Sequence, residues 1–68
     1  MQLSELAQKL KVELDTVLDD ESLRLVERAA EKLIAELELP YRVEDGAIVP
    51  DPSARHVELI IAYAKLIE

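Results

Sequence analysis

The final predicted helix, Pro52–Glu68, is apolar around most of its circumference, and this limits what so short a chain can fold into. Between Val57 and Ile67 only Glu58 and Lys65 are charged, and helical periodicity places both on one narrow wedge. The remaining side chains span roughly 220° of the helix, whereas a surface helix needs an apolar stripe only a little over about 100° wide. The surplus predicts contact with something outside the chain. The interface residues predicted on this helix are Val57, Leu59, Ile61, Ala62 and Leu66.

The length of the chain favours support from a partner. Its 68 residues make a single domain, 1–68, and a domain of this size buries only about 60% of the surface that its unfolded chain exposes. Small folds commonly add disulfides, a metal or oligomerisation. The sequence has no Cys and one His, which excludes disulfides, thiolate metal sites and a multi-His site within one chain. Self-association is therefore the expected support.

The charge balance argues against two classes of partner. The formal net charge is −7, whereas binding to phosphates requires clustered Lys and Arg. We therefore expect no specific nucleic-acid binding and no binding to an anionic membrane. No secretory or transit segment is recognisable, and no apolar run approaches the length that spans a bilayer.

Two helices are predicted in the first half of the chain. The first runs from about Ser4, as N-cap, to Lys11, and residues 12–18 are ambiguous between a further helical turn and a packed loop. The second runs from about Asp20 to Glu38, begins with Asp19 or Asp20 as cap, and ends before Pro40. Its predicted core stripe consists of Leu23, Val26, Ala30, Leu33 and Leu37, with Ile34 beside them.

Leu25 falls outside this predicted stripe. It lies roughly 125° from the centre of the stripe by the helical period, close to the charged residues Lys32 and Glu36. We therefore predict Leu25 as a sixth interface residue. The alternative is local packing against Leu14, Leu18 or the segment that follows the helix.

The segment Tyr41–Val49 is predicted to form a hairpin between the second and third helices. Asp45-Gly46 is a favoured type I′ turn pair, and Gly46 is the only glycine in the chain. Asp51 is the expected N-cap of the last helix, with Pro52 at its first position. The predicted fold class is all-α: a small bundle of three main helices with a short β-hairpin between helices 2 and 3.

Polar residues give no recognisable catalytic or metal-binding motif. Asp19, Asp20 and Glu21 point about 100° apart on a helix and lack EF-hand spacing, so helix capping explains them better than a cation site. His56 has no Ser or Cys nucleophile placed near it in a known motif, and we expect a surface or rim histidine. The chain is therefore not expected to be an enzyme, and no catalytic residue, metal ligand or cofactor is predicted.

One segment supports a DNA-binding alternative. Glu5-Leu6-Ala7, followed by Leu10 and Val12, resembles the opening of many helix-turn-helix domains. The recognition helix would then be 13–20, which contains four acidic residues and no Lys or Arg. Phosphate repulsion argues against this alternative.

The order of the elements resembles the phage head–tail connector (neck adaptor) family. The resemblance extends over nearly the whole chain: a short helix, 3–10, before an acidic stretch, a longer helix with a small-residue pair around 25–34, an extended link, 41–52, and a last helix that begins near a proline. Family members commonly continue into a docking tail, which the printed sequence does not contain.

The resemblance implies a virion structural protein. Such a subunit would be made in the host cytoplasm and would form a ring in the neck of the virion, with portal and tail proteins as partners. The acidic charge could keep such a ring from gripping DNA that passes through it. The alternatives are a small homo-oligomeric protein-interaction module and, less favoured, the helix-turn-helix regulator.

Overall fold

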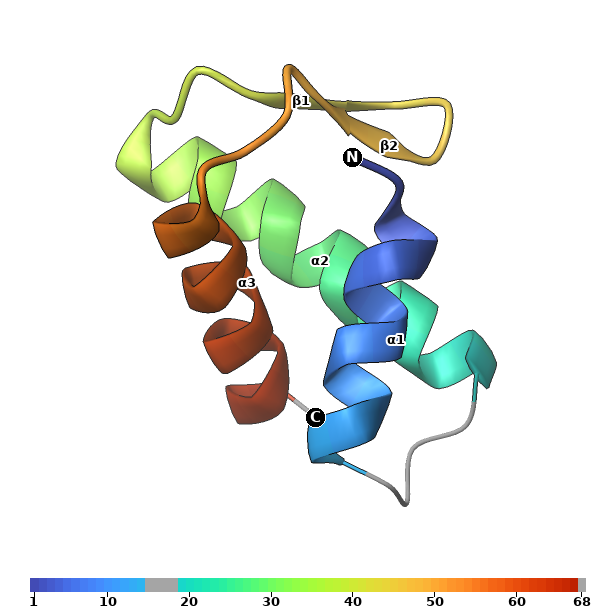
Figure 1. The fold of residues 1–68 in the computed structure, drawn as a ribbon. Coiled ribbons are helices and arrows are strands. Elements are labelled where there is room, and N and C mark those ends of the chain that lie inside the picture. The colour runs from blue at the N-terminus through green and yellow to red at the C-terminus, as the bar shows by residue number, and fades with distance from the viewer. Residues whose placement is uncertain (15–18, 68) are drawn as a thin grey trace.

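Three helices and a two-stranded hairpin make up the computed structural model, which describes residues 1–14 and 19–67. The elements are α1 (Leu3–Glu13), α2 (Asp19–Leu37), β1 (Arg42–Glu44), β2 (Ala47–Val49) and α3 (Ala54–Leu66). Helices α1 and α3 lie side by side, α2 crosses behind both, and the hairpin lies over one end of the bundle (Figure 1). The predicted fold class is confirmed.

The hairpin forms as the turn residues predict. Its strands pair antiparallel, with Val43 opposite Ile48. The turn residues Asp45 and Gly46 have φ angles of 50° and 75°. Positive φ at both positions defines a type I′ turn, which matches the right-handed twist of the strands. Ile48 is fully buried and fixes the hairpin to the helices.

The N-terminal residues pair with the hairpin, and α1 begins earlier than predicted. The backbone N–H of Ile48 donates to the carbonyl oxygen of Met1 at 2.7 Å, and the N–H of Leu3 donates to the carbonyl oxygen of Gly46 at 2.9 Å. The second bond satisfies one of the free N–H groups at the start of α1. The predicted cap at Ser4 is therefore wrong, because the N-cap is Gln2, whose side chain makes no capping bond.

The other end of α1 extends further than its predicted end at Lys11. Val12 and Glu13 belong to the helix, and Leu14 is its C-cap. The rest of the segment that the sequence left ambiguous, residues 15–18, lies outside the described residues.

The start of α3 also differs from the prediction. Its N-cap is Ser53, whose Oγ accepts a hydrogen bond from the backbone N–H of His56 at 3.3 Å. The predicted cap, Asp51, instead places Oδ1 2.5 Å from the N-terminal ammonium group of Met1. Pro52 precedes the helix and is not its first residue.

The core stripe of α2 is rotated from its predicted position. Ser22, Val26, Ala29 and Ala30 are fully buried, whereas the predicted core residues Leu23 and Leu37 are 41% and 52% exposed. The rotation is roughly 40° by the helical period. Small side chains at the centre of α2 fit the close packing of this helix against both α1 and α3.

This rotation changes the position of Leu25. Leu25 is half-buried and packs against the core, so its predicted place outside the core stripe is wrong. The local packing that the sequence left open as the alternative is closer to what the structure shows.

Candidate protein-interaction surface

Helix α3 has apolar residues on two faces. Ile60, Ile61 and Ala64 are buried on the inner face. On the outer face Leu59 is 43% exposed and Leu66 is 81% exposed, with Ala62 exposed between them. Folding of one chain therefore buries only part of the apolar arc that the sequence shows. Contacts outside this chain could bury the rest.

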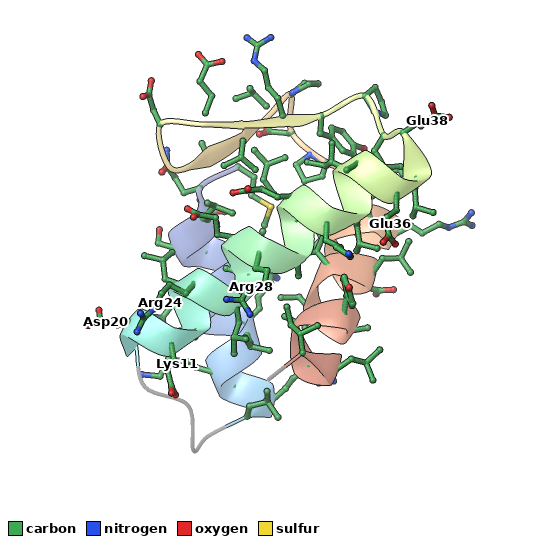
Figure 2. All side chains as sticks on the ribbon, turned by 180° about the vertical axis from the view of Figure 1, so that it is seen from behind. Lys11, Asp20, Arg24, Arg28, Glu36 and Glu38 are labelled. Carbon is green, nitrogen blue, oxygen red and sulfur yellow. The ribbon has the colours of Figure 1, made fainter. Side chains whose placement is uncertain are left out.

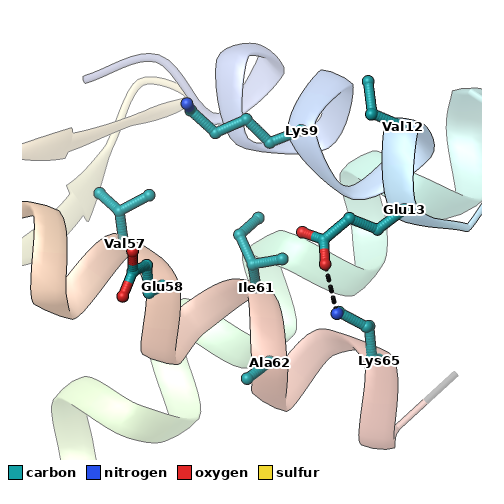
Figure 3. Close-up of a pocket in the computed structure, with 8 residues that line it drawn as sticks. All are labelled: Lys9, Val12, Glu13, Val57, Glu58, Ile61, Ala62 and Lys65. Atoms are coloured by element: carbon teal, nitrogen blue, oxygen red, sulfur yellow. Dashed lines mark hydrogen bonds and ion pairs between the residues drawn. The ribbon is translucent and has the colours of Figure 1, made fainter.

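A groove of about 520 Å³ runs between α1 and α3. Ile61 and Val57 line it from α3, and Val12 lines it from α1 (Figure 3). A second hollow of about 700 Å³ shares Lys9, Val57 and Glu58 with the first and reaches the N-terminal residues. The two hollows give this side of the molecule a concave strip, apolar along the first hollow and mixed in character along the second.

Charged residues line the sides of the groove. Lys65 Nζ forms an ion pair with Oε1 of Glu13, which links the last turn of α3 to the last turn of α1 (Figure 3). Lys9 and Glu58 line the groove further along. The charged wedge predicted for Glu58 and Lys65 is present, and both residues are exposed. Lys65 also pairs with Glu13 of α1.

The five interface residues predicted on α3 fall on two faces of that helix. Val57, Ile61 and Ala62 line the groove, while Leu59 and Leu66 lie on the outer face of α3. Ile61 is only 5% exposed, so it belongs to the core as well as to the groove floor. Leu25, on α2, is separate from this group.

Sequence reasoning missed the contribution of α1 to this surface. Val12 is 84% exposed, the largest exposed fraction reported for a large hydrophobic residue in the described part of the chain. A signal was present, because Val12 lies about 200° around the helix from Leu10, opposite the buried stripe. Lys9 and Glu13 could not be assigned to the surface before the pairing of α1 with α3 was known.

His56 lies at the rim of the fold, as predicted, and it is half-buried. Its Nδ1 is 2.7 Å from the hydroxyl of Tyr41, and the Tyr41 oxygen also accepts from the backbone N–H of Ser53 at 3.2 Å. The Ser53 hydroxyl in turn caps α3. These groups bond to one another and join the hairpin to the start of α3.

The helix-turn-helix interpretation requires a recognition helix at 13–20, and residues 15–18 of it lie outside the described residues. Glu13 ends α1, whereas Asp19 and Asp20 begin the long helix α2, so both ends of the proposed recognition element belong to other helices. The outer side of α2 has mixed charge (Figure 2). Its charged residues include Arg24, Glu27, Arg28, Glu31 and Lys32.

The described residues contain neither a metal-binding cluster nor a membrane-spanning helix, and the chain has no match among known proteins. Within residues 1–14 and 19–67, no cluster of three or more His, Cys, Asp or Glu side chains is arranged to hold a metal ion. In the same ranges, no helix combines the length and the apolar character needed to cross a bilayer. No protein-family model, no curated protein and no solved structure matches the chain.

Proposed function

We propose that this protein is an assembly subunit, whose work is to bind other protein surfaces through α1 and α3. The observation that carries the proposal is the exposure of Val12 and Leu66, at 84% and 81%, on helices whose inner faces already form the core. Large apolar side chains that stay exposed on two neighbouring helices favour protein contact. A partner would also add buried area to a fold that is small.

The specific form of this proposal is a head–tail connector subunit in the neck of a phage virion. It depends on the resemblance in element order. A ring between portal and tail requires each subunit to present two different faces to its neighbours. The groove between α1 and α3 and the mixed-charge outer side of α2 are two such faces. A homo-oligomeric interaction module is the second candidate, favoured by the exposed outer face of α3.

The test measures the mass of assemblies formed by the purified chain, alone and mixed with phage portal and tail proteins. Native mass spectrometry and negative-stain images should show oligomers, and closed rings for the connector form. Val12→Asp should reduce the largest species, because it places a charge beside the groove. Ala35→Asp, on an exposed position of α2, is the control and should have a smaller effect. A monomer in every mixture would contradict the proposal.

A further inference from the structure

The outer face of α3 carries a short heptad pattern. Arg55, Leu59, Ala62 and Leu66 are all exposed, and their spacing of four, three and four residues is that of the a and d positions of a coiled coil. Leu59 and Leu66 take a positions, and Arg55 and Ala62 take d positions. We call these four residues the α3 seam. The seam is separate from the buried face of the same helix, which contains Ile60 and Ala64.

Two residues of opposite charge, Glu58 and Lys65, lie beside the seam. Glu58 and Lys65 each precede an a position, so both are g residues on the same flank. They are seven residues apart, about 10.5 Å along the helix axis, which is too far for them to pair within one chain. The other flank holds His56 and Tyr63, which are half-buried. One flank therefore carries opposite charges at its two ends.

We propose that the α3 seam binds the α3 seam of a second copy of this chain, with the two helices antiparallel about a two-fold axis. The inference rests on the proposed function, because it names one contact that an assembly subunit makes. It does not depend on the ring form, since a two-fold contact is closed and gives a dimer.

The apolar residues fit this arrangement. In an antiparallel pair, a positions face d positions, so Leu59 lies over Ala62 of the second copy and Ala62 lies under its Leu59. Ala62 lets the two backbones approach closely. At each end, the aliphatic stem of Arg55 packs against Leu66 of the second copy. The Arg55 guanidinium group then lies near the last carbonyl groups of the other helix, where a positive charge is stabilised.

The charges select the antiparallel direction and a second copy as the partner. The two-fold axis keeps equivalent flanks together, so Glu58 faces Lys65 of the second copy, and the symmetry repeats this pair. In a parallel pair, g residues would face e residues, and Glu58 would meet uncharged Tyr63. Lys65 also keeps its partner Glu13, which lies on the same side of α3. The seam is therefore complementary to itself only when the helices are antiparallel.

Charge reversal tests this pairing directly. Glu58→Lys alone and Lys65→Glu alone each replace two attractive pairs with two repulsive ones, and each should weaken the dimer on the order of tenfold. An equimolar mixture of the two variants should form a heterodimer, because opposite charges then meet at both positions. The double variant Glu58→Lys/Lys65→Glu should recover homodimers. Sedimentation equilibrium gives the affinities, and circular dichroism melts monitor folding of each variant.

A matched pair of apolar substitutions tests the seam itself. Leu66→Ser should abolish the dimer, whereas Val12→Ser should leave it intact, although Val12 and Leu66 are almost equally exposed. If Leu66→Ser and both charge reversals leave association unchanged, the inference is overturned. That result would not contradict the proposed assembly function. A wild-type chain that stays monomeric alone and with portal and tail proteins would overturn both.

Discussion

The hydroxyl of Tyr41 and Nδ1 of His56 are 2.7 Å apart, and this contact joins the hairpin side of the fold to α3. The two rings meet edge to face, with centroids 5.3 Å apart. The Ser53 N–H also donates to the Tyr41 oxygen, and the direction of the Tyr41–His56 bond follows the tautomer of the imidazole ring. One phenol group thus orients both the N-cap and the first turn of α3.

Tyr41→Phe should therefore lower the free energy of unfolding by about 1–2 kcal/mol, since two hydrogen bonds are lost while the ring is kept. Thermal melts followed by circular dichroism would measure the loss. Tyr63→Phe is the matched control. Tyr63 is also half-buried, and no hydrogen bond of its hydroxyl is recorded among the described residues. An equal loss in both variants would contradict the role assigned to the Tyr41 hydroxyl.

Leu25 should contribute more to stability than Leu23, which is the reverse of the order expected from the sequence. Leu25→Ala should cost about 1–2 kcal/mol, because half-buried Leu25 packs against the core. Leu23→Ala should cost less than about 1 kcal/mol, because Leu23 is 41% exposed. Urea unfolding of the two variants compares them directly. If Leu25→Ala leaves stability unchanged and weakens assembly, Leu25 is an interface residue after all.

Gly46→Ala should destabilise the fold by about 1 kcal/mol through the backbone alone. The φ of Gly46 is 75°, and a Cβ added there would meet nothing within 4 Å, so no clash contributes. The neighbouring turn residue Asp45 also has positive φ, and Asp45→Gly should leave stability within about 0.5 kcal/mol of the wild type. Thermal melts of both variants would test this, and a neutral Gly46→Ala would contradict the type I′ turn.

Short sequence patterns predicted an element correctly where the residues of one short segment are enough to specify its conformation. The hairpin follows from Asp45-Gly46, because few residue pairs accept positive φ at two successive positions. The predicted caps at Ser4 and Asp51 were wrong for a reason that local patterns do not contain. The N-terminal residues join the hairpin, which supplies Leu3 with a carbonyl partner and brings Asp51 to the Met1 ammonium group.

The buried face of α2 was predicted less well, because large hydrophobic side chains on this helix are not the most buried ones. The centre of a three-helix contact favours small side chains, so Ser22 and Ala29 are buried while Leu37 is 52% exposed. On the candidate surface, the surplus arc of α3 could be predicted from its own sequence. The part played by Val12 depends on α1 lying beside α3, which no single segment encodes.

The most direct measurement is sedimentation equilibrium of the wild-type chain over a wide range of concentrations. We predict a reversible monomer–dimer equilibrium that approaches twice the mass of the chain at high concentration, and that Leu66→Ser shifts to monomer while Val12→Ser does not. A folded wild-type chain that remains monomeric at the highest concentration would contradict self-association through the outer face of α3.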